Sequence, residues 1–166
     1  MLLRPIAGSA ALLLLSALPV VAHGADRGTA KVAIAGKDVT IDYGRPVLKG
    51  RDMLAKAEVG KPWRLGADSP TTLTTDADLA FGPVQVPKGS YTLSATKTGE
   101  ATWVLNIVKT AKDGAAPQKV GDVPLQVTTL PESVEELTID LKDQGAATQL
   151  LISWGKTGLQ TTLTGK

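Results

Sequence analysis

The residues best suited to chemistry lie in two short stretches, 42–51 (DYGRPVLKGR) and 62–68 (PWRLGAD). The planar guanidinium groups of arginine suit carboxylate, sulfate or phosphate groups. Aromatic rings beside them suit the flat face of a sugar or another apolar ring. The two stretches therefore predict one concave surface for a small anionic or glycan-like ligand, formed by Tyr43, Arg45, Lys49, Arg51, Trp63, Arg64 and Asp68.

The same residues also have a purely structural interpretation. The arginines could pair with Asp42, Asp52 and Asp68 and so tie an irregular loop to a sheet. Convergence of the cations and rings on one open cleft would favour binding, whereas local ion pairs would favour the structural role.

Several catalytic classes are excluded by what the chain lacks. It contains no cysteine, and its one histidine is His23. Beyond residue 23, Ser-His-Asp catalysis, Cys-His catalysis and metal sites built on imidazole or thiolate are therefore ruled out. We predict no catalytic residue, no metal ligand and no cofactor. The formal net charge of +2 also gives no reason to expect a nucleic-acid partner.

Carboxylates provide two weaker candidates. Asp68, Asp76 and Asp78 suggest calcium, but their spacing is not that of a regular calcium loop, and turn aspartates explain them. A pair for glycoside hydrolysis could also be formed, although the spacing selects no pair. Its candidates are Asp42, Glu58, Asp68 and Glu100.

The first residues predict an export signal. Arg4 is followed by a short apolar run at residues 10–18, and small residues at 20–22 suit cleavage after Ala22, with Ala25 as a second possible point. The run is too short for a comfortable membrane span. We therefore predict a signal peptide at 1–22, one domain at 26–166, and a periplasmic or secreted protein without membrane association after cleavage.

Alternating apolar residues predict many short strands. Residues 31–35 and 39–43 form a hairpin with a turn at 36–38, and residues 84–86 and 91–95 form a second hairpin. Further strands are expected at 71–75, 79–81, 102–109, 137–141, 147–154 and 159–163, with a turn at 155–158 and a strand around Leu125 and Val127. Asp52 caps a predicted short helix through Ala57.

These elements predict an all-β fold. Eight to ten short strands separated by turns favour an antiparallel β-sandwich with one short helix, and a partly closed β-barrel is the alternative. Trp103 and Trp154 occupy strand patterns and are expected in the core.

Several segments, taken in order, resemble the DUF2911 family of exported bacterial proteins, whose function is unassigned. They are 39–46 (VTIDYGRP), 49–51 (KGR), 63–67 (WRLGA), 87–93 (PKGSYTL), 103–106 (WVLN) and 130–135 (LPESVE). Where the family usually has Asn-Glu, Asp68 and Ser69 stand here, and the segment before Trp63 is short and lacks the usual aromatic and glycine pair. The resemblance implies the fold and export, and it implies no reaction.

Three functions of different class follow. The first, which we favour, is an exported, non-catalytic binding or accessory domain with the basic-aromatic surface. The second is a structural or protein-interaction domain of the cell envelope that uses exposed sheet edges. The third is a carboxylate-based hydrolase. The sequence leaves the ligand and the oligomeric state open.

Overall fold

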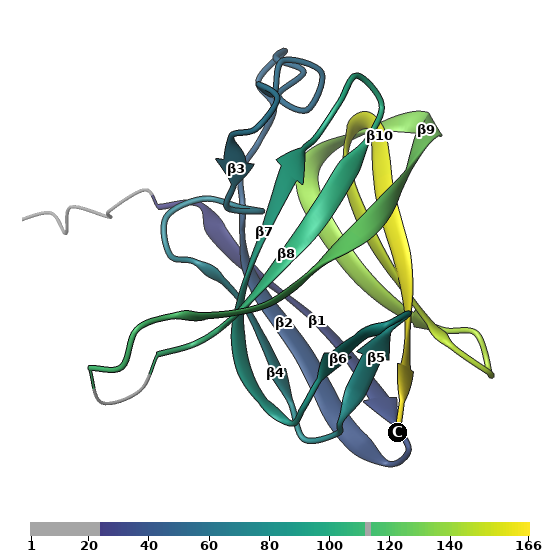
Figure 1. Ribbon diagram of the computed structural model, residues 1–166. Coiled ribbons are helices and arrows are strands. Elements are labelled where there is room, and N and C mark those ends of the chain that lie inside the picture. Colours follow the sequence, from purple (N-terminus) through teal and green to yellow (C-terminus); the bar gives the residue numbers. More distant parts are fainter. Residues whose placement is uncertain (1–23, 112–113) are drawn as a thin grey trace, which may run out of the picture.

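The computed structural model describes residues 24–111 and 114–166, which form ten strands and no helix (Figure 1). All pairings between strands are antiparallel, so the predicted antiparallel all-β fold is confirmed. The strands are β1 (Asp26–Ile34), β2 (Lys37–Arg45), β3 (Pro62–Trp63), β4 (Thr71–Thr75), β5 (Leu79–Phe81), β6 (Val84–Val86), β7 (Gly89–Lys97), β8 (Trp103–Lys109), β9 (Gln118–Asp143) and β10 (Thr148–Gly165).

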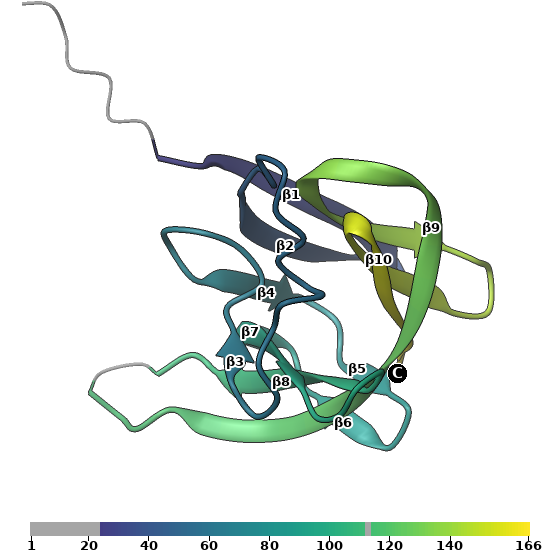
Figure 2. The same cartoon turned by 90° about the horizontal axis from the view of Figure 1, so that it is seen from above.

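The strands follow one hydrogen-bonded path, β1-β2-β4-β7-β8-β9-β10-β5-β6, and β3 adds to β7 beside it. Seen from above, the sheet curls around an interior, and β9 and β10 come round to face β1 and β2 (Figure 2). The sheet does not close into one continuous ladder. Alternate residues of its strands point into this curl and form a single hydrophobic core.

The predicted hairpin of β1 and β2 is present. Its two-residue turn is Ala35-Gly36, one residue earlier than expected, and Ile34 pairs with Lys37. Both turn residues have positive φ, 51° and 73°, which matches the twist of the flanking strands.

The predicted helix at residues 52–57 is wrong, because the segment forms only one turn. Asp52 does act as the expected cap, since its Oδ1 accepts a hydrogen bond from the N–H of Ala55 at 3.0 Å. One bond of helical spacing follows, from Lys56 N to the Asp52 carbonyl at 3.3 Å. A single turn does not repay the cost of helix nucleation, and Gly60 and Pro62 prevent its extension.

Two further local predictions are wrong. The second hairpin is not formed, because β6 pairs with β5, whereas β7 pairs with β4 and β8. The expected turn at 155–158 lies inside β10, which continues through irregularities in its pairing with β9 between Ser153 and Thr157. Turn-rich composition here marks a β-bulge instead of a chain reversal.

This bulge changes which residues of β10 point into the core. Before it, Leu150, Ile152 and Trp154 are buried, and after it, Leu159 and Leu163 are buried. The inward set therefore shifts from even to odd positions. Trp154 is the last inward residue before the shift and lies at the end of the core beneath the 46–61 loop, where Gly155 approaches Leu48.

Tyr43 joins β2 to β9 where the curled sheet comes round to meet its first two strands, a place that we call the seam. Its hydroxyl accepts a hydrogen bond from Ile139 N at 3.0 Å and donates to the Ile139 carbonyl at 3.4 Å. The ring passes over Gly28 of β1, where a Cβ would lie 2.7 Å from the ring. The Tyr43 hydroxyl therefore takes the hydrogen bonds of the Ile139 N–H and carbonyl, at a point where no strand pairs with this edge of β9.

The predicted signal peptide lies at residues 1–22, outside the described residues, and remains a prediction. Within 24–111 and 114–166, no helix is long and apolar enough to cross a membrane.

Candidate functional site

The long connection between β2 and β3, residues 46–61, is held to β9 at its start. Leu48 N donates to the Glu135 carbonyl at 3.0 Å, and Val47 forms an isolated bridge with Glu136. Leu48 and Leu54 are buried and anchor the connection to the core. In Figure 1 this 46–61 loop rises above β3, at the end of the molecule opposite the C-terminus.

The next segment is positioned by pairing and by a close backbone approach. Pro62 and Trp63 pair with Thr96 and Ala95 of β7. The chain then crosses β2 so tightly that a Cβ on Gly44 would lie 2.2 Å from the Ala67 carbonyl oxygen. Only glycine fits at this contact, which fixes the segment that carries Trp63.

All three tryptophans of the chain form one cluster at this end of the sheet. The ring of Trp63 stacks on that of Trp154, with 5.7 Å between centroids and 10° between planes. Trp63 meets Trp103 edge to face at 6.4 Å and 76°. Trp103 and Trp154 are each 4% exposed, as the sequence predicted for core residues, and Trp63 is half-buried.

A groove of about 600 Å³ opens over this cluster, between the 46–61 loop, β3 and β10. We call it the tryptophan groove. It is lined by Pro46, Arg51, Met53, Leu54, Lys56, Ala57, Glu58, Lys61, Pro62, Trp63, Gly66 and Trp154. Its lining is mostly apolar with a few charged groups, the usual composition of a small-molecule site.

The charged groups of the groove are three cations and one carboxylate. Lys61 pairs with Glu58 at 2.8 Å. In the part of the chain that the structure describes, Arg51 and Lys56 form no ion pair. Two cations are thus free to meet an anionic group beside an aromatic surface.

Of the seven residues predicted for the site, the structure brings Arg51 and Trp63 together in the groove. Tyr43 is buried and serves the seam with β9. Arg45 is engaged with β9, because its guanidinium bonds Glu136 at 2.9 Å and the Leu137 carbonyl at 3.4 Å. These two residues fit the structural interpretation, with Glu136 as a partner that the sequence did not suggest.

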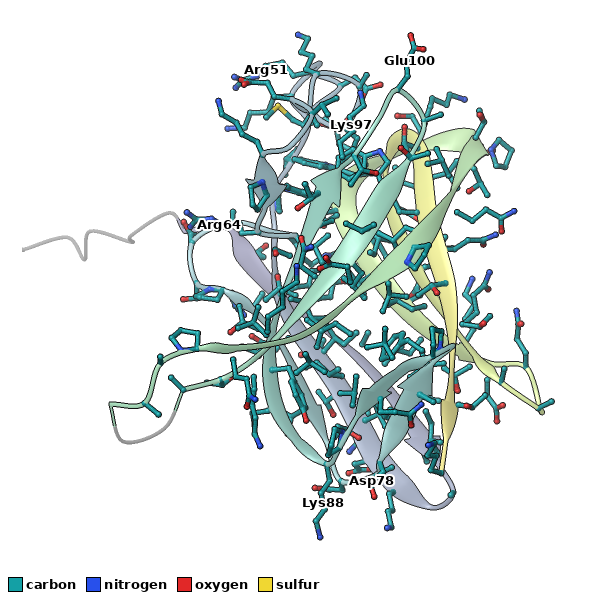
Figure 3. All side chains as sticks on the ribbon, in the orientation of Figure 1. Arg51, Arg64, Asp78, Lys88, Lys97 and Glu100 are labelled. Atoms are coloured by element: carbon teal, nitrogen blue, oxygen red, sulfur yellow. The ribbon has the colours of Figure 1, made fainter. Side chains whose placement is uncertain are left out.

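The other three predicted residues lie outside the groove lining. Arg64 donates to the Asp68 carbonyl at 3.1 Å, and Asp68 accepts from Ala25 N at 2.7 Å. Lys49 is an exposed turn residue whose N–H donates to Glu135. Figure 3 shows Arg51 and Arg64 well apart, Arg51 at the outer end of the 46–61 loop and Arg64 lower, near β1.

Most of the groove lining was missed by sequence reasoning, including Met53, Leu54, Lys56, Lys61 and Trp154. The sequence predicts a short helix over residues 52–57 of this loop, so Met53, Leu54 and Lys56 received no role in the predicted site. Trp154 was assigned to the core, and it is buried as expected while also forming part of the groove floor. Its partner Trp63 lies far away in sequence, and no local pattern indicates this contact.

The carboxylates considered from sequence are mostly engaged elsewhere. Asp42 pairs with Arg27, and Asp78 Oδ1 accepts a hydrogen bond from Lys88 N at 2.8 Å. Glu58 is the one carboxylate in the groove lining, and retaining or inverting glycosidases use two. Among residues 24–111 and 114–166, no group of three or more His, Cys, Asp or Glu side chains is placed to hold a metal ion.

Two groups with shifted pKa values lie away from the groove lining. Hydrogen bonds from Lys119 and then Asn106 hold the pKa of Asp122 on β9 below its ordinary value. Burial, and secondarily the charge of Asp78, raises the pKa of Tyr91, whose hydroxyl donates to the Pro87 carbonyl. Both are explained by strand and turn contacts.

Comparison with known proteins identifies the family of this chain. No curated protein and no solved structure gave a match. The family model for DUF2911, described as a protein of unknown function, matches residues 25–163, which include β1 to β9 and most of β10. The matched range covers most of the chain, and the protein therefore belongs to the DUF2911 family.

Proposed function

We propose that the protein is an exported, non-catalytic binding or accessory domain. Its tryptophan groove takes a small anionic or glycan-like ligand. The ligand that fits best combines a flat ring face with an acidic group, as in an acidic saccharide or an aromatic carboxylate. The ring lies against the Trp63 surface, and the acid meets Arg51 and Lys56.

One observation carries this proposal: the half-buried Trp63, backed by Trp154, lies in the same groove as two cations without an ion-pair partner in the described chain. A ring rigidly backed by another ring offers a contact surface at little entropic cost. A free guanidinium beside it supplies the polar contact that orients a ligand.

The test uses the intrinsic fluorescence of the protein. Because the chain has three tryptophans and all belong to this cluster, fluorescence reports directly on the groove. We expect an acidic oligosaccharide or an aromatic carboxylate to change the emission saturably. Calorimetry should give one site per chain. A panel of such compounds without any saturable change would refute the proposal.

A matched pair of variants locates the site. Arg51→Gln should weaken binding about tenfold, the value of one charge-assisted hydrogen bond. Arg64→Gln removes an exposed arginine outside the lining and should leave the affinity unchanged. Equal losses in the two variants would indicate a general charge effect and not this site.

Export is part of the proposal and is supported by the pattern of residues 1–22. Cleavage after Ala22 would retain Ala25, whose N–H donates to Asp68 at 2.7 Å, whereas cleavage after Ala25 would remove it. We therefore favour a mature chain that begins at His23. Cell fractionation and the intact mass of the exported protein test both statements.

A further inference from the structure

The exposed apolar side chains of the protein are concentrated in the 46–61 loop. Four large hydrophobic residues are exposed in the described chain, and three of them lie in this loop: Val47 at 42%, Met53 at 43% and Val59 at 61%. The fourth is Val127 of β9, at 36%. Single exposed apolar residues are ordinary, but their confinement to one projecting loop indicates a contact surface.

The same loop is basic. It carries four cations, Lys49, Arg51, Lys56 and Lys61, and two carboxylates, Asp52 and Glu58. Glu58 is paired with Lys61, Asp52 caps the turn at Ala55, and the Glu135 carboxylate accepts a hydrogen bond from the backbone N–H of Lys49. The side chains of Lys49, Arg51 and Lys56 form no ion pair within the described residues. The loop lies at one end of the molecule, and Figure 3 shows Arg51 at that end, with Lys88 at the opposite end.

Exposed apolar side chains flanked by cations on a protruding segment match the surface of an anionic bilayer. The apolar groups enter the boundary between headgroups and acyl chains, and the cations meet the phosphates. We propose that the 46–61 loop docks the protein on a membrane surface rich in anionic phospholipid. This departs from the sequence-based expectation of no membrane association after cleavage, and it is independent of the proposed ligand.

Docking would hold the tryptophan groove at the membrane surface. Met53, Arg51 and Lys56 belong both to the exposed loop and to the groove lining, whereas Val47, Lys49 and Val59 belong to the exposed loop and lie outside the lining. Substitutions at these last three positions therefore test docking without changing the groove. With the loop on the bilayer, the groove would open close to the headgroups.

The experiment measures sedimentation of the purified protein with vesicles of phosphatidylcholine, with and without phosphatidylglycerol. We expect binding only to the anionic vesicles, weakening as salt is added. Val59→Asp should weaken binding about 50-fold, because it removes one buried valine, worth about tenfold, and adds one negative charge, worth about fivefold. Lys49→Glu changes the charge by two units and should weaken binding roughly 25-fold, since each unit contributes roughly fivefold.

Matched controls replace the same residue types elsewhere. Val127→Asp and Lys88→Glu should bind the vesicles as the unchanged protein does. All variants carry the same N-terminus, so any contribution of residues 1–22 cancels. The proposal is overturned if anionic vesicles are not bound, if neutral vesicles bind equally, or if the controls lose as much as the loop variants.

The two proposals fail separately. Val59 and Lys49 lie outside the groove lining, so their variants should keep any fluorescence response to a small ligand. Loss of vesicle binding with an intact fluorescence response supports membrane docking by the loop. Parallel loss of both responses would overturn it, because the variants would then have disturbed the fold.

Discussion

Two hollows of similar size differ in whether their polar groups are available to bind a ligand. The tryptophan groove measures about 600 Å³, and a hollow beside β9 and β10 measures about 540 Å³. We call the second the glutamine hollow. It is lined by Pro124, Leu125, Gln126, Gln144, Gln149, Gln160, Thr161 and Thr162.

The glutamine hollow satisfies its own polar groups. Gln144 donates to Gln149 at 3.2 Å, Gln149 to Gln160 at 2.7 Å, and Gln160 to Gln126 at 2.9 Å. Its amides are thus largely occupied by one another. The tryptophan groove instead presents cations without ion partners and an aromatic surface. Available chemistry, more than volume, distinguishes the two.

The largest effect should come from Gly44→Ala, which disrupts the wall of the tryptophan groove. The new Cβ would meet the Ala67 carbonyl, and we expect a loss of about 3 kcal/mol in unfolding free energy. Urea denaturation measures it. Gly145→Ala, next to Gln144, is the control. No atom lies within 4 Å of its added Cβ, and its positive φ costs only about 1 kcal/mol. Equal losses would contradict the assigned contact.

Trp63→Ala should come next, because Trp63 is only half-buried. We expect a loss of about 2 kcal/mol in unfolding free energy, from lost stacking on Trp154 and lost burial. Trp63→Phe should recover part of this stability, because a smaller ring still stacks. Calorimetric melting compares the two. If alanine and phenylalanine behave alike, ring stacking does not stabilise the groove.

Gln149→Leu should have a smaller effect, although it breaks two of the three amide contacts in the glutamine hollow. The neighbouring amides reach water, so we expect a loss below about 1 kcal/mol. Tryptophan emission should not change, because none of the three tryptophans lines this hollow. A changed emission spectrum would show that the two hollows are coupled.

The smallest effect should come from Asp122→Asn, which changes how stability depends on pH. The Asp122 carboxylate accepts hydrogen bonds from Lys119 and Asn106. Its folded-state pKa is lowered, so its contribution to stability is present above the unfolded pKa and is lost as pH falls through the folded value. Asp122→Asn should therefore lower the urea midpoint slightly at pH 7 and by less at about pH 3. An equal change at both pH values would point to lost packing instead.

Most of the fold was predictable because it rests on local alternation. Val39, Ile41 and Tyr43 share one face of β2, and the first two are plainly core residues. Because Tyr43 shares this face with two core residues, the alternation itself indicates that Tyr43 is buried and does not form a wall of the groove. The bulge in β10 was harder to foresee, since Gly155 and Gly158 also suit a turn.

The site was only partly predictable because it depends on contacts between distant segments. Arg45 forms an ion pair with Glu136, and Trp63 stacks on Trp154, and the partners are about ninety residues apart in sequence in each case. Neither partner is marked by any nearby motif. Arg51 and Trp63 were found because arginines and aromatic rings are uncommon in this chain, whereas Met53 and Lys56 looked like parts of an ordinary helix.

The seam at Tyr43 has a consequence for solubility. An open strand edge invites pairing with the same edge of another molecule, the first step toward aggregation. One phenolic hydroxyl blocks this at Ile139 by occupying both its N–H and its carbonyl. Replacing Tyr43 with phenylalanine would keep the ring but leave the buried N–H and carbonyl of Ile139 unpaired. The β2–β9 contact should then open more readily, and oligomers on a sizing column should be the first symptom.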